Sequence, residues 1–407
     1  MINHWLAFGM SDVSTTGFQD TSRLMTSAFD GDVCYVSPPK PFSAWKRLDG
    51  KILRWTVGKS DSWNVLTPPL PIPSKIDLGT MFSRLRVRNL EQRLVRLWGR
   101  DWRDTTVVYV TNWTPFYHQI LLQLQPKHLA FDCVDDVLAF PYRWDQRRVH
   151  ESWQRIADIS TVVLAVSPLL KEKVEQSLHV TTHVLPNGVD AKRFMQGEEE
   201  VPNEISPYRR RVGFAGTLNH WIDFAAIKTF ALTYPDVDFF LMGKEGYLHD
   251  SYQRDAQGQV RQLPNVHYLG AIDYDELPRY LQAMDVLFLP RIPSSASQSS
   301  NPLKLYEYLA TGKPIVMTGV PIPSDAQRLI HTSSAHLTPA DALLAALDEA
   351  EGRAPNMKHA RQNYALSHTW KLRMQAVLGL IEAARASRHE PDPGVCEQET
   401  DSVDVVR

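Results

Sequence analysis

The sequence predicts an α/β protein made of two doubly wound parallel sheets. Short apolar runs alternate with helical patterns in both halves of the chain, and most runs end at glycine, proline or a polar residue. Between the halves, the stretch at 191–210 contains glycine, proline and three consecutive glutamates, and it reads as a linker. Because a chain of 407 residues is too long to fold around a single hydrophobic core, we expect one domain at 1–190 and another at 211–366.

In the first half, apolar runs of strand length are separated by amphipathic segments of helix length. The expected strands are 5–8, 33–36, 106–111, 128–131 and 162–166. The expected helices are 21–29, 85–97, 115–124, 145–158 and 168–178. This order predicts a parallel sheet with helices on both faces.

The second half repeats the alternation. Its expected strands lie in the segments RRVGFAGT, VDFFLMG, NVHYLG, VLFLP and PIVMT. Ligands of such sheets bind at the carboxyl ends of the strands, so two sheets predict a site in the cleft between them. The last residues, 389–407, are acidic and contain proline, and we expect them to be disordered.

Composition argues against several classes of protein. With 44 basic and 46 acidic residues, the net charge of −2 gives no reason to expect nucleic acid as a partner. The cysteines, Cys34, Cys133 and Cys396, are odd in number and widely spaced, which indicates neither a disulfide framework nor a zinc site. The start lacks the pattern of a signal peptide, and no apolar run reaches the length of a membrane span. We therefore expect a cytoplasmic protein, which could still rest on the inner face of the membrane.

The segment 286–318 predicts an anion site. It reads as a short apolar strand, a serine-rich loop and a helix, with Asn301 as the expected N-cap and Pro302 in the first turn. The helix N-terminus then faces the carboxyl end of a sheet, where its amides and dipole favour a phosphate and Lys304 adds a charge. Glu307, on a neighbouring part of the helix face, could accept hydrogen bonds from ribose hydroxyls. The alternative is an ordinary surface ion pair between Lys304 and Glu307.

Glycines predict a second close approach of backbone to this cleft. Gly213, Gly216 and Thr217 follow a strand start and open a helix, so the backbone there could contact a diphosphate. Lys244, after the glycine that ends VDFFLMG, could meet a phosphate. The alternatives are a tight turn without a ligand and a solvated surface lysine. The chain has no GxGxxG fingerprint, which counts against a dehydrogenase.

The motif FDCVDD places three carboxylates, Asp132, Asp135 and Asp136, at the carboxyl end of a predicted strand. Clustered carboxylates raise one another's pKa, which suits a general base that deprotonates an acceptor hydroxyl. The alternative is that these residues cap a helix or a turn.

The segment 84–103 is strongly basic, with seven arginines against two acids in an otherwise neutral chain. In the expected helix, one face is formed by Leu90, Leu94 and Leu97. Another face is formed by Arg93, Arg96 and Arg100. Such a helix could contact an anionic membrane and bring the site to a lipid-linked acceptor. The alternative is a helix that faces the core and has a solvated basic side.

Four motifs resemble the GT-B glycosyltransferases, especially bacterial members of the retaining family 4 and the related glucuronosyltransferases of polysaccharide assembly. In chain order they are FDCVDDVLAFP, LPNGVDAKRF, GFAGTLNHWIDF and NPLKLYEYLATGKPIV, and the resemblance covers most of the chain. The resemblance implies two Rossmann-like domains, with the acceptor bound mainly by 1–190 and the nucleotide-sugar by 211–366. It also implies a last helix, at 367–388, that crosses back to the first domain.

The resemblance implies roles for single residues as well. It makes Asp135, or its neighbour Asp136, the base of an inverting reaction. It places the donor against a set of residues from the second half: Gly216, Thr217, Lys244, Asn301, Leu303, Lys304 and Glu307. It implies neither a metal ion nor a cofactor, because the fold usually stabilises the leaving diphosphate with a helix dipole and basic side chains. Ser299 stands where family 4 members usually carry an acidic residue, which puts retaining chemistry in question.

We therefore expect a glycosyltransferase that moves a sugar from a nucleotide-diphosphate donor to a hydroxyl of a glycan or lipid-linked acceptor. Two alternatives stay open. One is a nucleotide-sugar epimerase or hydrolase on the same fold, against which the basic segment 84–103 argues mildly. The other is a non-catalytic module that binds nucleotide or glycan, for which the serine at position 299 is the only support.

Overall fold

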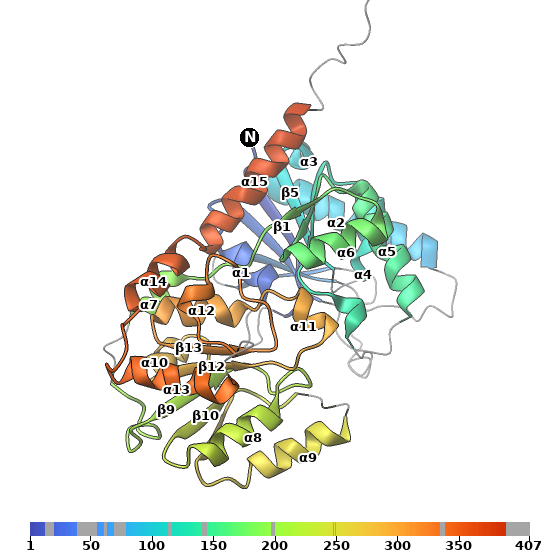
Figure 1. Ribbon diagram of the computed structural model, residues 1–407. Coiled ribbons are helices and arrows are strands. Elements are labelled where there is room, and N and C mark those ends of the chain that lie inside the picture. The colour runs from blue at the N-terminus through green and yellow to red at the C-terminus, as the bar shows by residue number, and fades with distance from the viewer. Residues whose placement is uncertain are drawn as a thin grey trace, which may run out of the picture.

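The computed structural model describes residues 1–12, 20–38, 55–60, 63–68, 79–112, 116–140, 145–196, 200–246, 248, 250–333 and 338–387. The expected tail at 389–407 lies outside this part of the chain. The described residues form two α/β domains, one above the other in Figure 1, with the helix α15 (Trp370–Ser387) running back along the first domain.

The first domain is built on an eight-stranded sheet with the order β3-β4-β2-β1-β5-β6-β7-β8. Neighbouring strands are parallel, except that β3 and β4 form an antiparallel pair at one edge. The strands are β1 (His4–Phe8), β2 (Asp32–Val36), β3 (Thr56–Ser60), β4 (Trp63–Thr67), β5 (Thr106–Thr111), β6 (His128–Cys133), β7 (Val162–Ala165) and β8 (Thr182–Val184).

Helices cover both faces of this sheet. One face is covered by α2 (Gly79–Trp98), α4 (Phe116–Leu124), α5 (Gln146–Ile159) and α6 (Pro168–Leu178), and the other by α1 (Thr21–Ser27) and α15. The short helix α3 (Trp102–Thr105) precedes β5. Along β1, Leu6 and Phe8 pack under the helices on one face of the sheet. Trp5 and Ala7 pack under those on the other face, as the twofold periodicity of a strand requires. The expected crossing helix therefore supplies half of one layer of the first domain.

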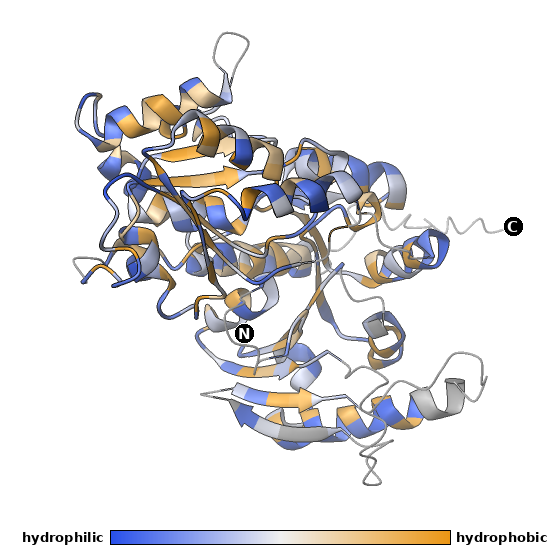
Figure 2. Cartoon of the chain, turned by 90° about the horizontal axis from the view of Figure 1, so that it is seen from below, coloured by the Kyte–Doolittle hydropathy of each residue, from blue (hydrophilic) through white to orange (hydrophobic). Residues whose placement is uncertain are grey.

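The second domain has a five-stranded parallel sheet with the order β11-β10-β9-β12-β13. Its strands are β9 (Arg211–Ala215), β10 (Asp238–Met242), β11 (Val266–Gly270), β12 (Val286–Pro290) and β13 (Ile315–Thr318). Its helices are α8 (Phe224–Thr233), α9 (Ser251–Val260), α10 (Leu277–Gln282), α11 (Ser295–Ser299), α12 (Leu303–Thr311), α13 (Pro339–Ala350) and α14 (Lys358–Leu366). Figure 2 shows strands that are largely hydrophobic and helices that alternate between hydrophilic and hydrophobic residues, as expected for buried sheets under amphipathic helices.

The strand order reverses once in each sheet, between β1 and β5 in the first and between β9 and β12 in the second. At such a switch point the connections leave in opposite directions, and a crevice opens at the carboxyl ends of the strands. The fold therefore provides two crevices for a ligand.

The described residues of the expected linker, 191–196 and 200–210, contribute more to the second domain than their composition indicates. The first of these residues form the helix α7 (Ala191–Met195), and Phe194 and Ile205 are fully buried in the core of the second domain. Apolar residues spaced among glycine and glutamate pull this segment onto the second sheet, because burying their side chains is favourable. No helix in the described ranges is long and apolar enough to span a bilayer.

Most strands of both sheets were expected, and the α/β fold class is confirmed. Three strands at or next to the edges of the first sheet, β3, β4 and β8, were not anticipated, because their sequences lack the continuous apolar runs of the central strands. The expected serine-rich loop after β12 contains the helix α11, whose N-cap Ser294 accepts a hydrogen bond from the amide of Ser297 at 3.1 Å.

Candidate active site

A cavity of about 450 Å³ lies between the two domains, at the carboxyl ends of both sheets. Its apolar walls include Val134 and Phe140 from the first domain and Phe214, Trp221 and Met242 from the second. Its polar groups come from both domains as well: Asp135, Thr217, Lys244, Arg291, Asn301 and Lys304. The site is therefore the cleft that the two switch points predict.

The N-terminus of α12 opens into this cavity, since Asn301, Pro302, Leu303 and Lys304 line it. The expected N-cap role of Asn301 is wrong: the N-cap is Pro302, with no side-chain hydrogen bond to the first turn. The Asn301 side chain instead accepts a hydrogen bond from the amide of Asn187 at 2.8 Å and donates one to the hydroxyl of Tyr306 at 2.9 Å. Asn301 therefore ties the two domains together and leaves the helix start without a side-chain cap, a geometry that suits an anion.

Lys304 and Glu307 form the i,i+3 ion pair, with 2.8 Å between Nζ and Oε2. It is not a surface pair, because the Glu307 side chain is 5% exposed and that of Lys304 27%. Burial raises the pKa of the neighbouring Tyr274 hydroxyl well above its usual range, and the charge of Glu307 adds to that effect. Lys304 lines the cavity, and Glu307 lies one layer behind it.

The backbone after β9 approaches the cavity closely. Gly216 has φ +153°, and its amide donates to the carbonyl of Met242 at 2.8 Å. A Cβ on Gly243 would lie 1.8 Å from the carbonyl oxygen of Gly216, so this crossing of two strand ends requires glycine. Thr217 and Lys244 follow these glycines and line the cavity.

The three aspartates of FDCVDD have separate surroundings. Asp132 is fully buried, accepts a hydrogen bond from the Tyr109 hydroxyl at 2.5 Å and pairs with Arg373 of α15 at 2.8 Å. Asp132 therefore fastens the crossing helix to β6. Asp135 lines the cavity, and its carbonyl accepts a hydrogen bond from the Asn112 side chain at 2.7 Å.

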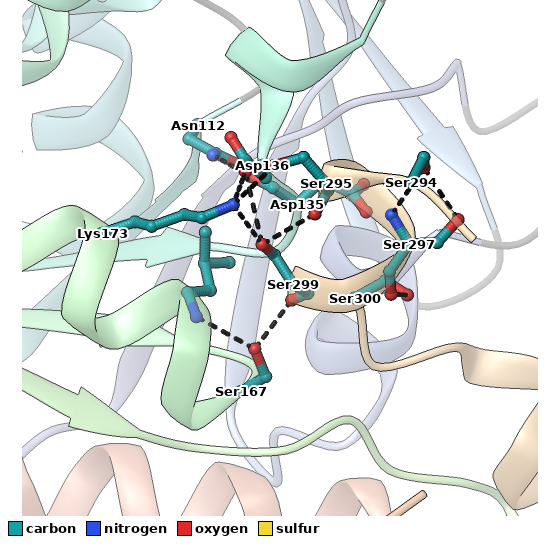
Figure 3. Close-up of polar contacts among 11 residues, drawn as sticks. Asn112, Asp135, Asp136, Ser167, Lys173, Ser294, Ser295, Ser297, Ser299 and Ser300 are labelled. Carbon is teal, nitrogen blue, oxygen red and sulfur yellow. Dashed lines mark hydrogen bonds and ion pairs between the residues drawn. The ribbon is translucent and has the colours of Figure 1, made fainter. Parts of the chain in front are cut away.

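Asp136 points away to a contact between the domains, which Figure 3 shows. Lys173 Nζ lies 2.6 Å from its carboxylate and donates to Ser295 and Ser299 of α11 at 2.9 and 2.7 Å. The Ser167 hydroxyl donates to the carbonyl of Ser299 at 2.7 Å. We call Asp136, Lys173, Ser295 and Ser299 the interdomain serine cluster. Ser299 is fully buried within it, so the position expected to be acidic in family 4 serves domain contact.

Comparison with known proteins decides the family of the second domain. Residues 209–350 match the family described as Glycosyl transferases group 1. They form a group 1 glycosyltransferase domain. A stretch of 243 residues is 29% identical to a protein of Bacillus subtilis strain 168 assigned to teichuronic acid biosynthesis as the glycosyltransferase TuaH. The match spans 57% of this chain and 60% of the length of TuaH.

Solved structures share the fold of the whole chain. Sucrose-phosphate synthase from Thermosynechococcus elongatus superposes with a TM-score of 0.67 at 14% identity, over 95% of this chain and 100% of its own. HepE of Anabaena, solved in complex with UDP-glucose, superposes with a TM-score of 0.64 at 14% identity, over 93% of this chain and 99% of its own. These likenesses confirm that the chain has the GT-B fold.

Two groups beside the glycosyltransferase domain's glycine turn were not predicted as site residues. Phe140 of the first domain packs edge-on against Trp221 of the second, with 5.9 Å between ring centroids. Arg291, directly after β12, lies over the same indole, with 5.3 Å from its guanidinium carbon to the ring centroid. A lone arginine after the apolar run VLFLP was the available signal for this residue.

Asp223, a few residues after this turn, caps α8 by accepting a hydrogen bond from the amide of Ala226 at 2.8 Å. Among the described residues, no three His, Cys, Asp or Glu side chains come together in an arrangement that could hold a metal ion.

Proposed function

We propose that the chain transfers a sugar from a nucleotide-diphosphate donor to a hydroxyl of a glycan or lipid-linked acceptor in polysaccharide assembly. One observation carries the proposal: a single cavity between the domains presents an uncapped helix start with Lys304 on one wall and the Asp135 carboxylate on the other. A donor diphosphate and a reacting hydroxyl need opposite kinds of group, and the cavity holds both. The group 1 glycosyltransferase domain and the UDP-glucose bound to HepE support this assignment.

On the donor wall, the α12 dipole and Lys304 bind the diphosphate. The turn at Gly216 and Thr217 brings main chain to the same ligand, and Lys244 adds a further charge at the cavity. We assign Glu307 to the ribose hydroxyls. Its carboxylate lies directly behind Lys304, which lines the cavity, with 2.8 Å between Nζ and Oε2.

On the acceptor wall, Asp135 is the base of an inverting reaction. Its carboxylate takes the proton of the acceptor hydroxyl while the acceptor oxygen forms a bond to the anomeric carbon. The bond from that carbon to the diphosphate breaks, and the nucleoside diphosphate leaves with the electron pair. The helix dipole and the lysines of the donor wall stabilise the charge that develops on it, so we propose that no divalent metal ion is required.

We propose further that the exposed side of α2 contacts an anionic membrane surface and brings the cavity to a lipid-linked acceptor. Leu85 and Leu97 are 48% and 37% exposed on this helix, next to exposed arginines. Basic residues attract anionic headgroups, and apolar side chains enter the interface.

A panel of nucleotide-diphosphate sugars tests the proposed function. A donor that binds only the folded state raises the melting temperature by mass action, so the cognate donor should give the largest increase. Release of the nucleoside diphosphate should then depend on added acceptor. Hydrolysis or epimerisation of the donor without acceptor would establish the alternative enzyme class, and binding without turnover would establish a non-catalytic module.

A further inference from the structure

Arg291 occupies the switch point of the second sheet. It directly follows β12, which lies beside β9 at the position where the strand order reverses. Its main chain is fixed on both sides: it forms a bridge with Ile222, and its amide donates to the carbonyl of Thr318 at 3.3 Å. The crevice at such a point is where open α/β sheets bind their ligands, so the backbone holds Arg291 at the centre of the site.

The guanidinium of Arg291 is half-buried and incompletely paired among the described residues. Its Nε is buried, and no described residue accepts a hydrogen bond from it. No described carboxylate lies within ion-pair distance of Arg291, whereas the fully buried arginines Arg361 and Arg373 each have a partner within 2.8 Å. Arg291 is half-buried, and a cation whose buried Nε has no hydrogen-bond partner among the described residues is unfavourable, so its position at a cavity points to a ligand that supplies one.

The surroundings of Arg291 define the charge of that ligand. Burial lowers the pKa of Arg291 to about 10, and the negative charge of Asp135 opposes this shift, so the side chain is cationic at neutral pH. The aromatic walls formed by Trp221 and Phe140 exclude water and strengthen electrostatic attraction. A planar guanidinium presents parallel N–H groups that match the two oxygens of a carboxylate or phosphate.

We propose that Arg291 binds an oxyanion at the reacting end of the donor, beside Asp135, as a contact additional to that of Lys304. Two groups of a nucleotide-diphosphate sugar have this chemistry and reach this place: the phosphate attached to the sugar and a carboxylate carried by the sugar itself. Arg291 is thus a donor-binding residue, and a carboxylate ligand makes it the residue that selects an acidic sugar. The inference rests on the proposed function.

The test measures equilibrium binding of UDP, UDP-glucose and UDP-glucuronate to the full chain, to Arg291→Met and to Arg291→Lys. Loss of a charge-assisted contact weakens binding by roughly 10- to 100-fold. If the oxyanion is the phosphate, Arg291→Met weakens all three ligands by similar factors. If it is the sugar carboxylate, only UDP-glucuronate binding weakens, and Arg291→Lys, which keeps the charge without the paired N–H groups, recovers part of it.

The controls separate the inference from folding and from the proposed function. Arg291→Met removes a half-buried charge that has no ion-pair partner among the described residues, so the melting temperature without ligand should equal or exceed that of the unaltered chain. Unchanged affinity of both variants for all three ligands would overturn the role of Arg291 and leave the proposed function standing. Failure of the unaltered chain to bind any nucleotide or nucleotide-sugar would overturn both.

Discussion

Lys304 lies where one charge decides how well a diphosphate binds: it lines the cavity at the start of α12. We predict that Lys304→Ala lowers kcat/KM for the donor by ten- to a hundredfold, because a charged contact to phosphate contributes roughly 1.5–3 kcal/mol. Initial rates over a range of donor concentrations measure this effect. Lys371→Ala is the matched control, since that lysine is 62% exposed on α15 and does not line the cavity. Equal donor kinetics in both variants would contradict the assignment.

Asp135 and Asp136 are neighbours in sequence with different surroundings, which separates catalysis from domain contact. We predict that Asp135→Asn lowers kcat by about 10²–10⁴ while donor affinity stays near normal, because the amide cannot accept the acceptor's proton. Asp136→Asn removes the carboxylate that faces Lys173 and should weaken the interdomain serine cluster without removing the base.

Single-turnover rates and donor titrations distinguish these two effects. If Asp136→Asn loses activity and Asp135→Asn retains it, the base lies one residue further along the chain. If both variants retain activity, no inverting base lies in this motif, and a retaining reaction is the better account.

Among the residues of the site, the sequence predicted those that a local sequence pattern indicates. Lys304 follows a helix start and Asp135 a strand end, and both lie at the cavity. The pairings Asn187 with Asn301 and Lys173 with Ser299 join residues more than 100 positions apart, and no local pattern encodes them. The same holds for Arg291, whose importance depends on how the second sheet faces the first domain.

The helix α2 is amphipathic as expected, but its core face differs from the predicted one. Val87, Leu90, Leu94 and Trp98 are buried, at most 9% exposed, whereas Leu97 is 37% exposed and joins the outer surface. The helix turns 100° per residue, so positions 87, 90, 94 and 98 share one face and position 97 falls outside it. An exposed leucine among arginines strengthens the membrane proposal.

We predict that the chain co-sediments with vesicles of anionic lipid and not with neutral vesicles. Changing Arg88, Arg96 and Arg100 to glutamate should abolish this binding, because each basic residue near an anionic surface contributes about 1 kcal/mol. The matched control changes three exposed arginines of α5, Arg147, Arg148 and Arg155, to glutamate and should leave binding intact. Equal sedimentation with both lipids would favour a solvated basic face.

The whole molecule depends on α15, which leaves the second domain and completes a layer of the first. Trp370, Met374, Val377 and Ile381 pack against β-strand residues of the first sheet, and Arg373 meets Asp132 inside the protein. The chain therefore passes between the two domains twice, once in the segment before β9 and once at the start of this helix. The resemblance implied this crossing, whereas composition and periodicity predicted only a helix.

The second domain contains a buried ion pair between two of its helices. Glu349 of α13 is 2% exposed and accepts hydrogen bonds from Arg361 of α14 at 2.6 and 2.7 Å. Burial raises the pKa of Glu349, but the hydrogen bonds from Arg361 and His331 outweigh it and lower that pKa to about 2.

A carboxyl whose pKa falls from 4.5 in the unfolded chain to about 2 in the folded one stabilises the fold fully above pH 4.5. That stabilisation is lost as the pH falls from 4.5 to 2. We predict that Glu349→Gln lowers the free energy of unfolding at pH 7 by roughly 3–5 kcal/mol, because Arg361 stays buried without its charge partner. The variant should also lose the pH dependence between 4.5 and 2.

Urea unfolding at several pH values measures both effects, with Glu382→Gln on the exposed side of α15 as the control for a lost surface carboxylate. If Glu349→Gln and Glu382→Gln show the same free energy at pH 7 and the same slope in acid, the Glu349 pair does not hold the second domain together. If Glu349→Gln lowers the free energy of unfolding at pH 7 but keeps its pH dependence between 4.5 and 2, other buried carboxylates account for that dependence. Asp132, paired with Arg373 in the first domain, is then the next position at which to remove a charge.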